Sequence, residues 1–140
     1  MEIQPYLFFE GRCEEAVELY RRALDAEVES LTRYEESPEP PPPEMVPPGS
    51  GKKIMHVTLR IGGAVVMASD GGCSGRTSFG GFSLSLTVPD AETADRFFAA
   101  LAEGGEVRMP LGETFWSPRF GMVADRFGVG WMITLPLKAT

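Results

Sequence analysis

The chain has 140 residues, of which 43% are hydrophobic and 24% are charged, a balance typical of one globular domain with a full hydrophobic core. The formal net charge is −7, with 20 acidic residues against 13 basic ones. Nucleic acids and anionic membranes need clustered Lys and Arg, and this chain has no basic stripe. We therefore expect neither as a partner.

The N-terminal residues, the apolar runs and the cysteines indicate the cellular compartment of the protein and the redox state of its thiols. The N-terminus lacks the charged-then-apolar layout of a signal peptide, and no apolar run approaches the roughly 18 residues that span a bilayer. Cys13 and Cys73 form no spacing motif. These features predict a cytoplasmic protein with reduced thiols.

The first half of the chain has the pattern of a strand, a helix and three more strands. Aromatic and alternating runs predict the strands, and apolar residues at i, i+3, i+4 and i+7 predict the helix. The last two strands form a hairpin at Gly62-Gly63, because paired glycines accept a positive φ. The predicted ranges are a strand over 3–9, a helix over 13–26, and strands over 27–36, 54–61 and 64–69.

Two segments of this half are predicted to be irregular. Residues 37–53 contain seven prolines, which donate no backbone hydrogen bond, so this proline-rich loop is neither a central strand nor a helix. Residues 70–81 form a glycine-rich linker that lacks the order of a phosphate-binding loop. The proline-rich loop is interpreted as a tolerated insertion rather than as a docking motif.

The second half repeats the order of the first. Asp90 is a good N-cap for a helix that ends at Gly104-Gly105. Its buried stripe is predicted to consist of Ala94, Phe97, Phe98 and Leu101. Around this helix we expect strands over 82–88, 106–111, 122–127 and 130–137, with an aromatic-rich loop over 112–121.

The residues themselves support an internal duplication. Ala16 and Ala94 hold equivalent places in the two helices, and Val28 and Val107 follow them at nearly the same spacing. The last hairpins match as RIGGAVVMA (60–68) and RFGVGWMIT (126–134), with a gap that the proline-rich loop explains.

Such a repeat predicts an α+β fold made of two βαβββ modules, about 1–70 and 81–137, within a single domain over 1–140. We expect a curved eight-stranded mixed sheet with the helices outside and a concave cleft. A cleft between repeats is the default site for a ligand.

Four stretches of the chain carry a family resemblance, namely PYLFFEGRCEEAVELYRRAL (5–24), IMHVTLRIGGAVVMASD (54–70), GFSLSLTV (81–88) and FWSPRFGMVADRFGVGWMI (115–133). Together they resemble the PhnB-like branch of the vicinal oxygen chelate superfamily, which also holds glyoxalase I and the bleomycin-resistance proteins. The resemblance implies a homodimer, in which modules are sometimes exchanged between chains. Some members are labelled ubiquinone-pathway methyltransferases, but this chain has no glycine-rich strand-to-helix turn for a nucleotide cofactor.

The resemblance also allows a test for a metal. In metal-dependent relatives, the first and last strands of each module each supply one His, Glu or Gln. Here those positions fall on Pro5, Met67, Ser83 (or Ser85) and Met132. None of them offers an imidazole or a carboxylate, so we expect no metal and no cofactor.

His56, the one histidine of the chain, is the tentative catalytic residue. Strict alternation places it on one strand face with Thr58 and Arg60, opposite Met55, Val57 and Leu59. It is either a structural residue or a general base and hydrogen-bond partner.

Further candidates are polar and aromatic residues on the strands and on the aromatic-rich loop. Such residues either pack in the core or line a ligand pocket, and Arg119 could hold an anionic group. Charged residues beside turns are interpreted as surface pairs of little energetic weight, namely Asp70, Glu113, Arg119, Asp125 and Arg126. The predicted ligand-binding residues are Tyr6, Phe8, Met67, Ser83, Ser85, Trp116, Arg119, Phe120 and Trp131.

These observations favour a metal-independent homodimer that binds a small molecule of unknown identity. Two alternatives stay open. One is a lyase or isomerase of the same superfamily, dependent on a metal or on His56. The other is a resistance protein that sequesters a drug. The sequence leaves open whether the chain is an enzyme.

Overall fold

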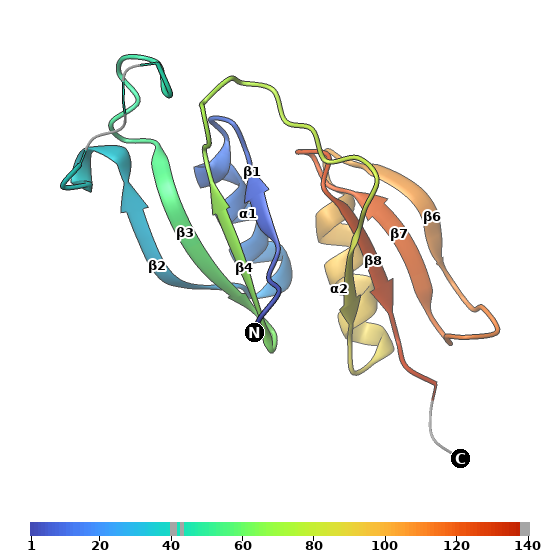
Figure 1. Ribbon diagram of the computed structural model, residues 1–140. Coiled ribbons are helices and arrows are strands. Elements are labelled where there is room, and N and C mark those ends of the chain that lie inside the picture. Colours follow the sequence, from blue (N-terminus) through green and yellow to red (C-terminus); the bar gives the residue numbers. More distant parts are fainter. Residues whose placement is uncertain (40–41, 43, 138–140) are drawn as a thin grey trace. The chain divides into compact units, whose positions relative to one another are not determined.

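Two structural units, Met1–Thr77 and Ser78–Thr140, make up the chain in the computed structural model (Figure 1). The structure describes residues 1–39, 42 and 44–137. We call the two parts unit 1 and unit 2.

Unit 1 contains a four-stranded sheet and a helix. The strand order is β1-β4-β3-β2, in which β1 pairs with β4 in parallel and the other neighbours are antiparallel. A short 3₁₀ turn, Tyr34–Glu36, follows β2. The bounds are β1 Tyr6–Phe8, α1 Cys13–Leu24, β2 Glu27–Arg33, β3 Ile54–Ile61 and β4 Ala64–Ser69.

Unit 2 repeats this topology strand for strand. Its order is β5-β8-β7-β6, again with a parallel first pair and two antiparallel pairs. The α+β fold of two βαβββ modules is therefore confirmed, with the eight strands in two four-stranded sheets. The bounds are β5 Leu84–Thr87, α2 Ala91–Ala102, β6 Glu106–Gly112, β7 Phe120–Ala124 and β8 Gly130–Thr134.

The predicted strand over 27–36 is too long. It ends at Arg33, because the Glu36 carboxylate accepts the Arg33 amide at 2.7 Å and the chain turns. The strand predicted over 3–9 is shorter, and that predicted over 122–127 begins two residues earlier. Within the proline-rich loop, residues 40, 41 and 43 lie outside the described ones.

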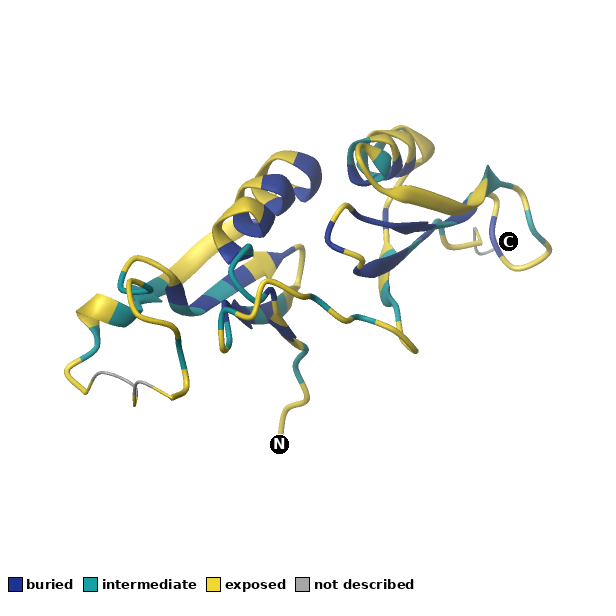
Figure 2. Cartoon of the chain, turned by 90° about the horizontal axis from the view of Figure 1, so that it is seen from above, coloured by how far each residue is buried: buried dark blue, intermediate teal, exposed yellow. Residues whose placement is uncertain are grey.

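Each helix covers one face of its own sheet and buries an apolar stripe against it (Figure 2). Asp90 caps α2 as predicted, and its side chain accepts the Thr93 amide at 2.8 Å. Phe97 is only half-buried, with the Arg96 guanidinium 4.9 Å from its ring centre. The predicted apolar positions that are buried are Ala16, Val17, Tyr20, Ala23 and Leu24 in α1, and Ala94, Phe98 and Leu101 in α2.

Asp70, directly after β4, joins three elements of unit 1. It is 1% exposed, and its Oδ1 accepts the amides of Gly11 (2.9 Å) and Cys13 (2.7 Å). Its Oδ2 accepts the amide of Ile54, the first residue of β3, at 2.7 Å. The N-cap residue of α1 is Arg12, which forms no side-chain cap. Asp70 therefore supplies from a distance the negative charge and the acceptor that the helix start needs.

Asp125 has a comparable structural role in unit 2. It is 3% exposed, and its Oδ1 accepts the amides of Phe127 and Val129 in the turn before β8. Its Oδ2 accepts the indole N–H of Trp131 at 2.9 Å. The interpretation of Asp70 and Asp125 as surface charges was wrong, because backbone and indole N–H groups offset the cost of burying them.

Both cysteines are free thiols, as expected. Among the helices of the described part of the chain, none is long and apolar enough to cross a membrane.

We predict that Asp70→Asn lowers the free energy of unfolding by about 2–3 kcal/mol. Asparagine has only one side-chain oxygen, so its NH₂ group would face one of the backbone N–H groups, and that N–H would lose its acceptor. Urea denaturation followed by far-UV circular dichroism measures this change. Asp90→Asn is the matched control, since Asn caps a helix about as well as Asp. Equal losses in the two variants would contradict the joining role of Asp70.

Candidate functional site

A pocket of about 470 Å³ opens on unit 1. Three aromatic rings line it, those of Tyr6 and Phe8 on β1 and of Tyr34 just after β2. The proline-rich loop contributes Met45 and Val46. The other lining residues are Glu10, Met55, Ser69, Gly71 and Gly72.

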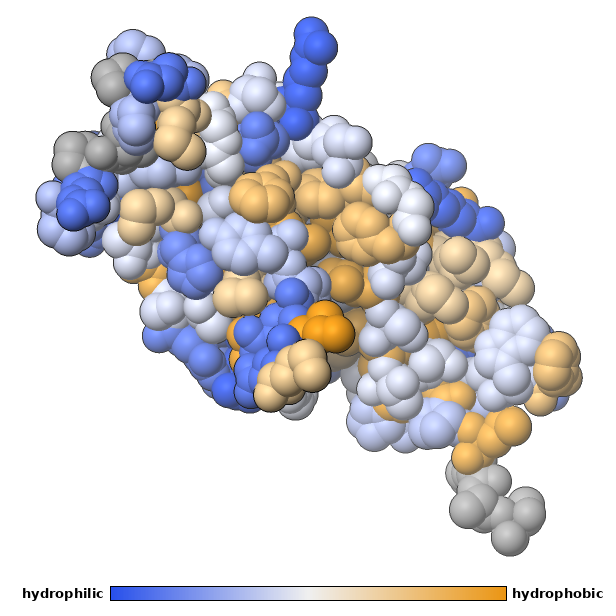
Figure 3. All heavy atoms as spheres, viewed as in Figure 1, coloured by the Kyte–Doolittle hydropathy of each residue, from blue (hydrophilic) through white to orange (hydrophobic). Residues whose placement is uncertain are grey.

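Tyr6 and Phe8 reach this pocket because side chains alternate along β1. Leu7 between them is buried, whereas Phe8 is 52% exposed. The rings of Tyr6 and Phe8 lie 5.0 Å apart, tilted by 37°. A space-filling view shows apolar side chains exposed among polar ones on unit 1 (Figure 3). Both residues were predicted to bind a ligand, and the structure brings them together in one pocket.

Met55 enters the pocket because β3 contains a bulge. Thr32 pairs with His56 and Arg33 pairs with Ile54, so one step along β2 matches two along β3. The extra residue shifts the alternation, and Met55 lines the pocket instead of packing with Val57. The sequence-based assignment of Met55 to the opposite face was therefore wrong.

Tyr34 closes one side of the pocket and was missed by the sequence analysis. Its hydroxyl donates to the carbonyl of Gly71 at 2.6 Å. Gly71 has a φ of 54°, and a Cβ there would overlap Oε2 of Glu10. The positive φ favours glycine at this point, and the bond from Tyr34 ties the glycine-rich linker to the pocket wall. No sequence signal links Tyr34 with Gly71.

His56 lies beside the pocket and contacts one of its walls. Its Nδ1 is 3.2 Å from the Tyr6 hydroxyl, and its Nε2 is 3.0 Å from the Thr58 hydroxyl. His56 and Thr58 therefore share a face of β3, as alternation predicted. Hydroxyl groups donate or accept, so the contacts of the His56 ring with the Tyr6 and Thr58 hydroxyls accommodate either tautomer of the ring. A catalytic role for His56 stays a prediction.

The other predicted ligand-binding residues divide between the units. Met67 pairs with Tyr6 in unit 1, next to the pocket. In unit 2, Trp131 is 1% exposed in the core, and Arg119 is held by an ion pair with Asp95.

The aromatic-rich loop holds a stack of three rings in unit 2. Trp116 meets Phe115 at 4.8 Å and Phe120 at 5.3 Å between ring centres, in both cases edge to face. Phe120 is buried, whereas Phe115 and Trp116 are exposed.

The positions that hold a metal in metal-dependent relatives lie on neighbouring strands, one pair in each unit. The amide of Met67 donates to the carbonyl of Pro5 at 3.0 Å, and Ser85 pairs with Met132 across β5 and β8. Ser83 lies against Gly130. A thioether and a hydroxyl are poor donors for Mg²⁺, Mn²⁺ or Zn²⁺, so the residues do not fit such an ion. Among the described residues, no three His, Cys, Asp or Glu side chains gather as a ligand set.

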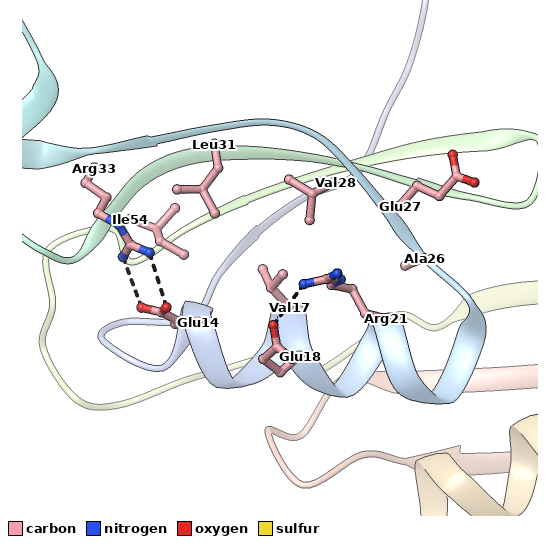
Figure 4. A pocket seen from close by; sticks show the side chains of 10 residues that line it. All are labelled: Glu14, Val17, Glu18, Arg21, Ala26, Glu27, Val28, Leu31, Arg33 and Ile54. Carbon is pink, nitrogen blue, oxygen red and sulfur yellow. Dashed lines mark hydrogen bonds and ion pairs between the residues drawn. The ribbon is translucent and has the colours of Figure 1, made fainter.

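A second pocket of about 480 Å³ lies between α1 and β2 (Figure 4). Its floor is apolar, and its rim carries two ion pairs. Glu14 binds Arg33 at 3.0 Å, and Glu18 binds Arg21 at 3.2 Å. Its charges largely neutralise one another.

Burial controls the titration of the thiols and the phenol near the unit 1 pocket. Burial raises the pKa of Cys13, and the negative charge of Asp70 adds to this effect. Burial likewise raises the pKa of Cys73, although a hydrogen bond with Ser50 opposes the change. The pKa of Tyr34 is raised by burial first, then by the Cys73 thiolate, which forms only at high pH, and by the negative charge of Asp70. These groups are therefore neutral near pH 7.

The chain matches known proteins in both sequence and fold. Residues 1–134 match the family model described as 3-demethylubiquinone-9 3-methyltransferase. The chain belongs to this family. Protein YjdN of Escherichia coli (strain K12) is 38% identical to it over 140 residues, which cover 96% of this chain and 95% of that protein.

Two solved structures extend this family likeness. Protein PA1353 from Pseudomonas aeruginosa is 41% identical, with a TM-score of 0.83 and 99% of each chain covered. A Bacillus cereus protein described as a putative 3-demethylubiquinone-9 3-methyltransferase, PhnB protein, is 33% identical, with a TM-score of 0.79 over 96% of this chain and 99% of that one. The fosfomycin resistance protein FosX from Listeria monocytogenes shares the fold alone, at 11% identity and a TM-score of 0.64 over 98% and 93% of the two chains. The resemblance to PhnB-like proteins is therefore confirmed.

We predict that Tyr34→Phe lowers the free energy of unfolding by about 1 kcal/mol near pH 7, through loss of the bond to Gly71. Because the fold raises the Tyr34 pKa, the stabilisation is present below about pH 10 and declines as the pH rises further. The difference between wild type and variant should therefore shrink in strong base.

Urea denaturation at pH 7 and above pH 10 measures this difference, and absorbance at 295 nm follows the ionisation of the phenols. Removing Tyr34 should delete a late-ionising component from the absorbance titration. A difference in stability that grows with pH would contradict the assignment.

Proposed function

We propose that this family member binds a small molecule in the pocket of unit 1. The observation that carries the proposal is the set of aromatic and sulfur-containing side chains that converge there from separate segments. A volume near 470 Å³ falls within the range of small-molecule sites. Polar groups that would fix the orientation of a ligand, such as Glu10 and the Tyr6 hydroxyl, are few.

Exposed apolar surface supplies the driving force in this proposal. Phe8, Tyr6 and Met45 all expose apolar atoms in the structure. Covering such atoms contributes about 25 cal/mol for each Å² removed from water. A flat or elongated apolar ligand suits rings of this kind.

The proposal includes neither a metal nor methyl transfer. The superfamily's metal positions hold proline, methionine and serine, which argues against the metal-dependent alternative. The strand-to-helix connection before α1 has one glycine, Gly11, and the connection before α2 has none. Neither resembles the glycine-rich turn that holds a nucleotide-type cofactor.

Acid–base chemistry at His56 is the second candidate function. Its support is the contact between Nδ1 and the Tyr6 hydroxyl, which lines the pocket. Sequestration of a drug would use the same pocket and differ only in the ligand. The homodimer and the cytoplasmic location stay predictions.

We predict that Phe8→Ala weakens the binding of a ligand found in a thermal-shift screen by about tenfold, because the pocket loses one of its aromatic walls. A ligand at 100 times its Kd adds about 2.7 kcal/mol of stability, so tenfold weaker binding removes roughly half of the shift. Phe115→Ala, at an 89% exposed phenylalanine in unit 2, is the matched control. If the ligand-induced thermal shift is lost in Phe115→Ala but kept in Phe8→Ala, the ligand does not bind in the unit 1 pocket.

A further inference from the structure

We propose that the unit 1 pocket selects organic cations, namely a protonated amine or a quaternary ammonium group attached to an apolar body. This inference rests on the proposed binding function and adds the chemical class of the ligand. It combines the aromatic walls of the pocket with the Glu10 carboxylate, which forms no ion pair with a basic side chain within the described part of the chain.

The carboxylate is that of Glu10, in the turn between β1 and α1. Glu10 has a φ of 51°, and its side chain lies against Gly71. Its Oε1 accepts the Ser74 amide at 3.4 Å, which is a long and weak hydrogen bond. Among the described residues, no Lys, Arg or His side chain forms an ion pair with Glu10. The nearby Lys53 ammonium instead donates to the carbonyl of Gly11 at 2.8 Å.

The aromatic walls complement this carboxylate. The rings of Tyr6, Phe8 and Tyr34 line the same pocket as Glu10. The face of an aromatic ring carries partial negative charge and attracts ammonium groups. Rings beside one carboxylate therefore favour a cation over a neutral or anionic ligand of the same shape.

The second pocket, between α1 and β2, differs from the unit 1 pocket because ion pairs neutralise the charges on its rim. It has nearly the same volume, but Arg33 and Arg21 pair with two of its carboxylates (Figure 4). The described residues that line the unit 1 pocket include no Lys or Arg. The net charge of −7 adds an attraction for cations at long range.

The titration of Tyr34 agrees with a negative local field. Burial is the first cause of its raised pKa, and the charges of Asp70 and Glu10 also contribute. Both carboxylates therefore act on a group in the pocket wall, where they would also act on a bound cation.

Three probes of matched shape test the inference, namely 4-phenylbutylamine, 4-phenylbutanol and 4-phenylbutyrate. Isothermal titration calorimetry at pH 7 compares them on wild type, Glu10→Gln and the control Glu103→Gln. Glutamine keeps an acceptor for the Ser74 amide, and Glu103 is an exposed residue of unit 2, so the control matches the change in net charge.

We expect the amine to bind at least tenfold more tightly than the alcohol, and the carboxylate to bind most weakly. Glu10→Gln should weaken the amine about tenfold and leave the alcohol unchanged, because only a charged partner gains from the carboxylate. Glu103→Gln should change none of them.

Two results would overturn the inference. If the alcohol binds as tightly as the amine, or if Glu10→Gln leaves the amine unaffected, selection for cations is wrong while small-molecule binding stands. If none of the three binds, the inference also fails. In that case, a thermal-shift screen that finds no Phe8-dependent ligand would remove the proposed function as well.

Discussion

The buried carboxylate of Asp70 is the interaction on which unit 1 depends. It accepts amides from the turn before α1, from the start of α1 and from the start of β3, while its own backbone continues β4. Without such an acceptor, the helix start would be uncapped, because Arg12 forms no cap. The carboxylate is buried at little net cost because three N–H groups share its charge.

The segment around Asp70 also shapes the adjacent unit 1 pocket. Gly71 follows Asp70 directly, accepts the Tyr34 hydroxyl and leaves room for the Glu10 side chain. Glu10 precedes the Gly11 amide that Asp70 binds. The groups that hold the fold together are thus chain neighbours of several groups that line the pocket.

The sequence predicts what depends on local periodicity and fails where tertiary contacts decide. Alternation around Leu7 places Tyr6 and Phe8 on one face, and the internal repeat fixes the topology of both units. A bulge in β3 overrides alternation and turns Met55 toward the pocket. Tyr34 was missed, and Asp70 was wrongly assigned to the surface, for a different reason. Their partners are distant in the sequence, so no spacing rule marks a charge that is buried by backbone amides.

The central claim is that a ligand occupies the unit 1 pocket, and methionine methyl NMR tests it most directly. Met45 and Met55 line that pocket, whereas Met109, Met122 and Met132 lie in unit 2. With the best-binding phenylbutyl probe, we expect shifts and intermolecular Overhauser effects at the Met45 and Met55 methyl groups. Changes confined to the methionines of unit 2 would contradict the account.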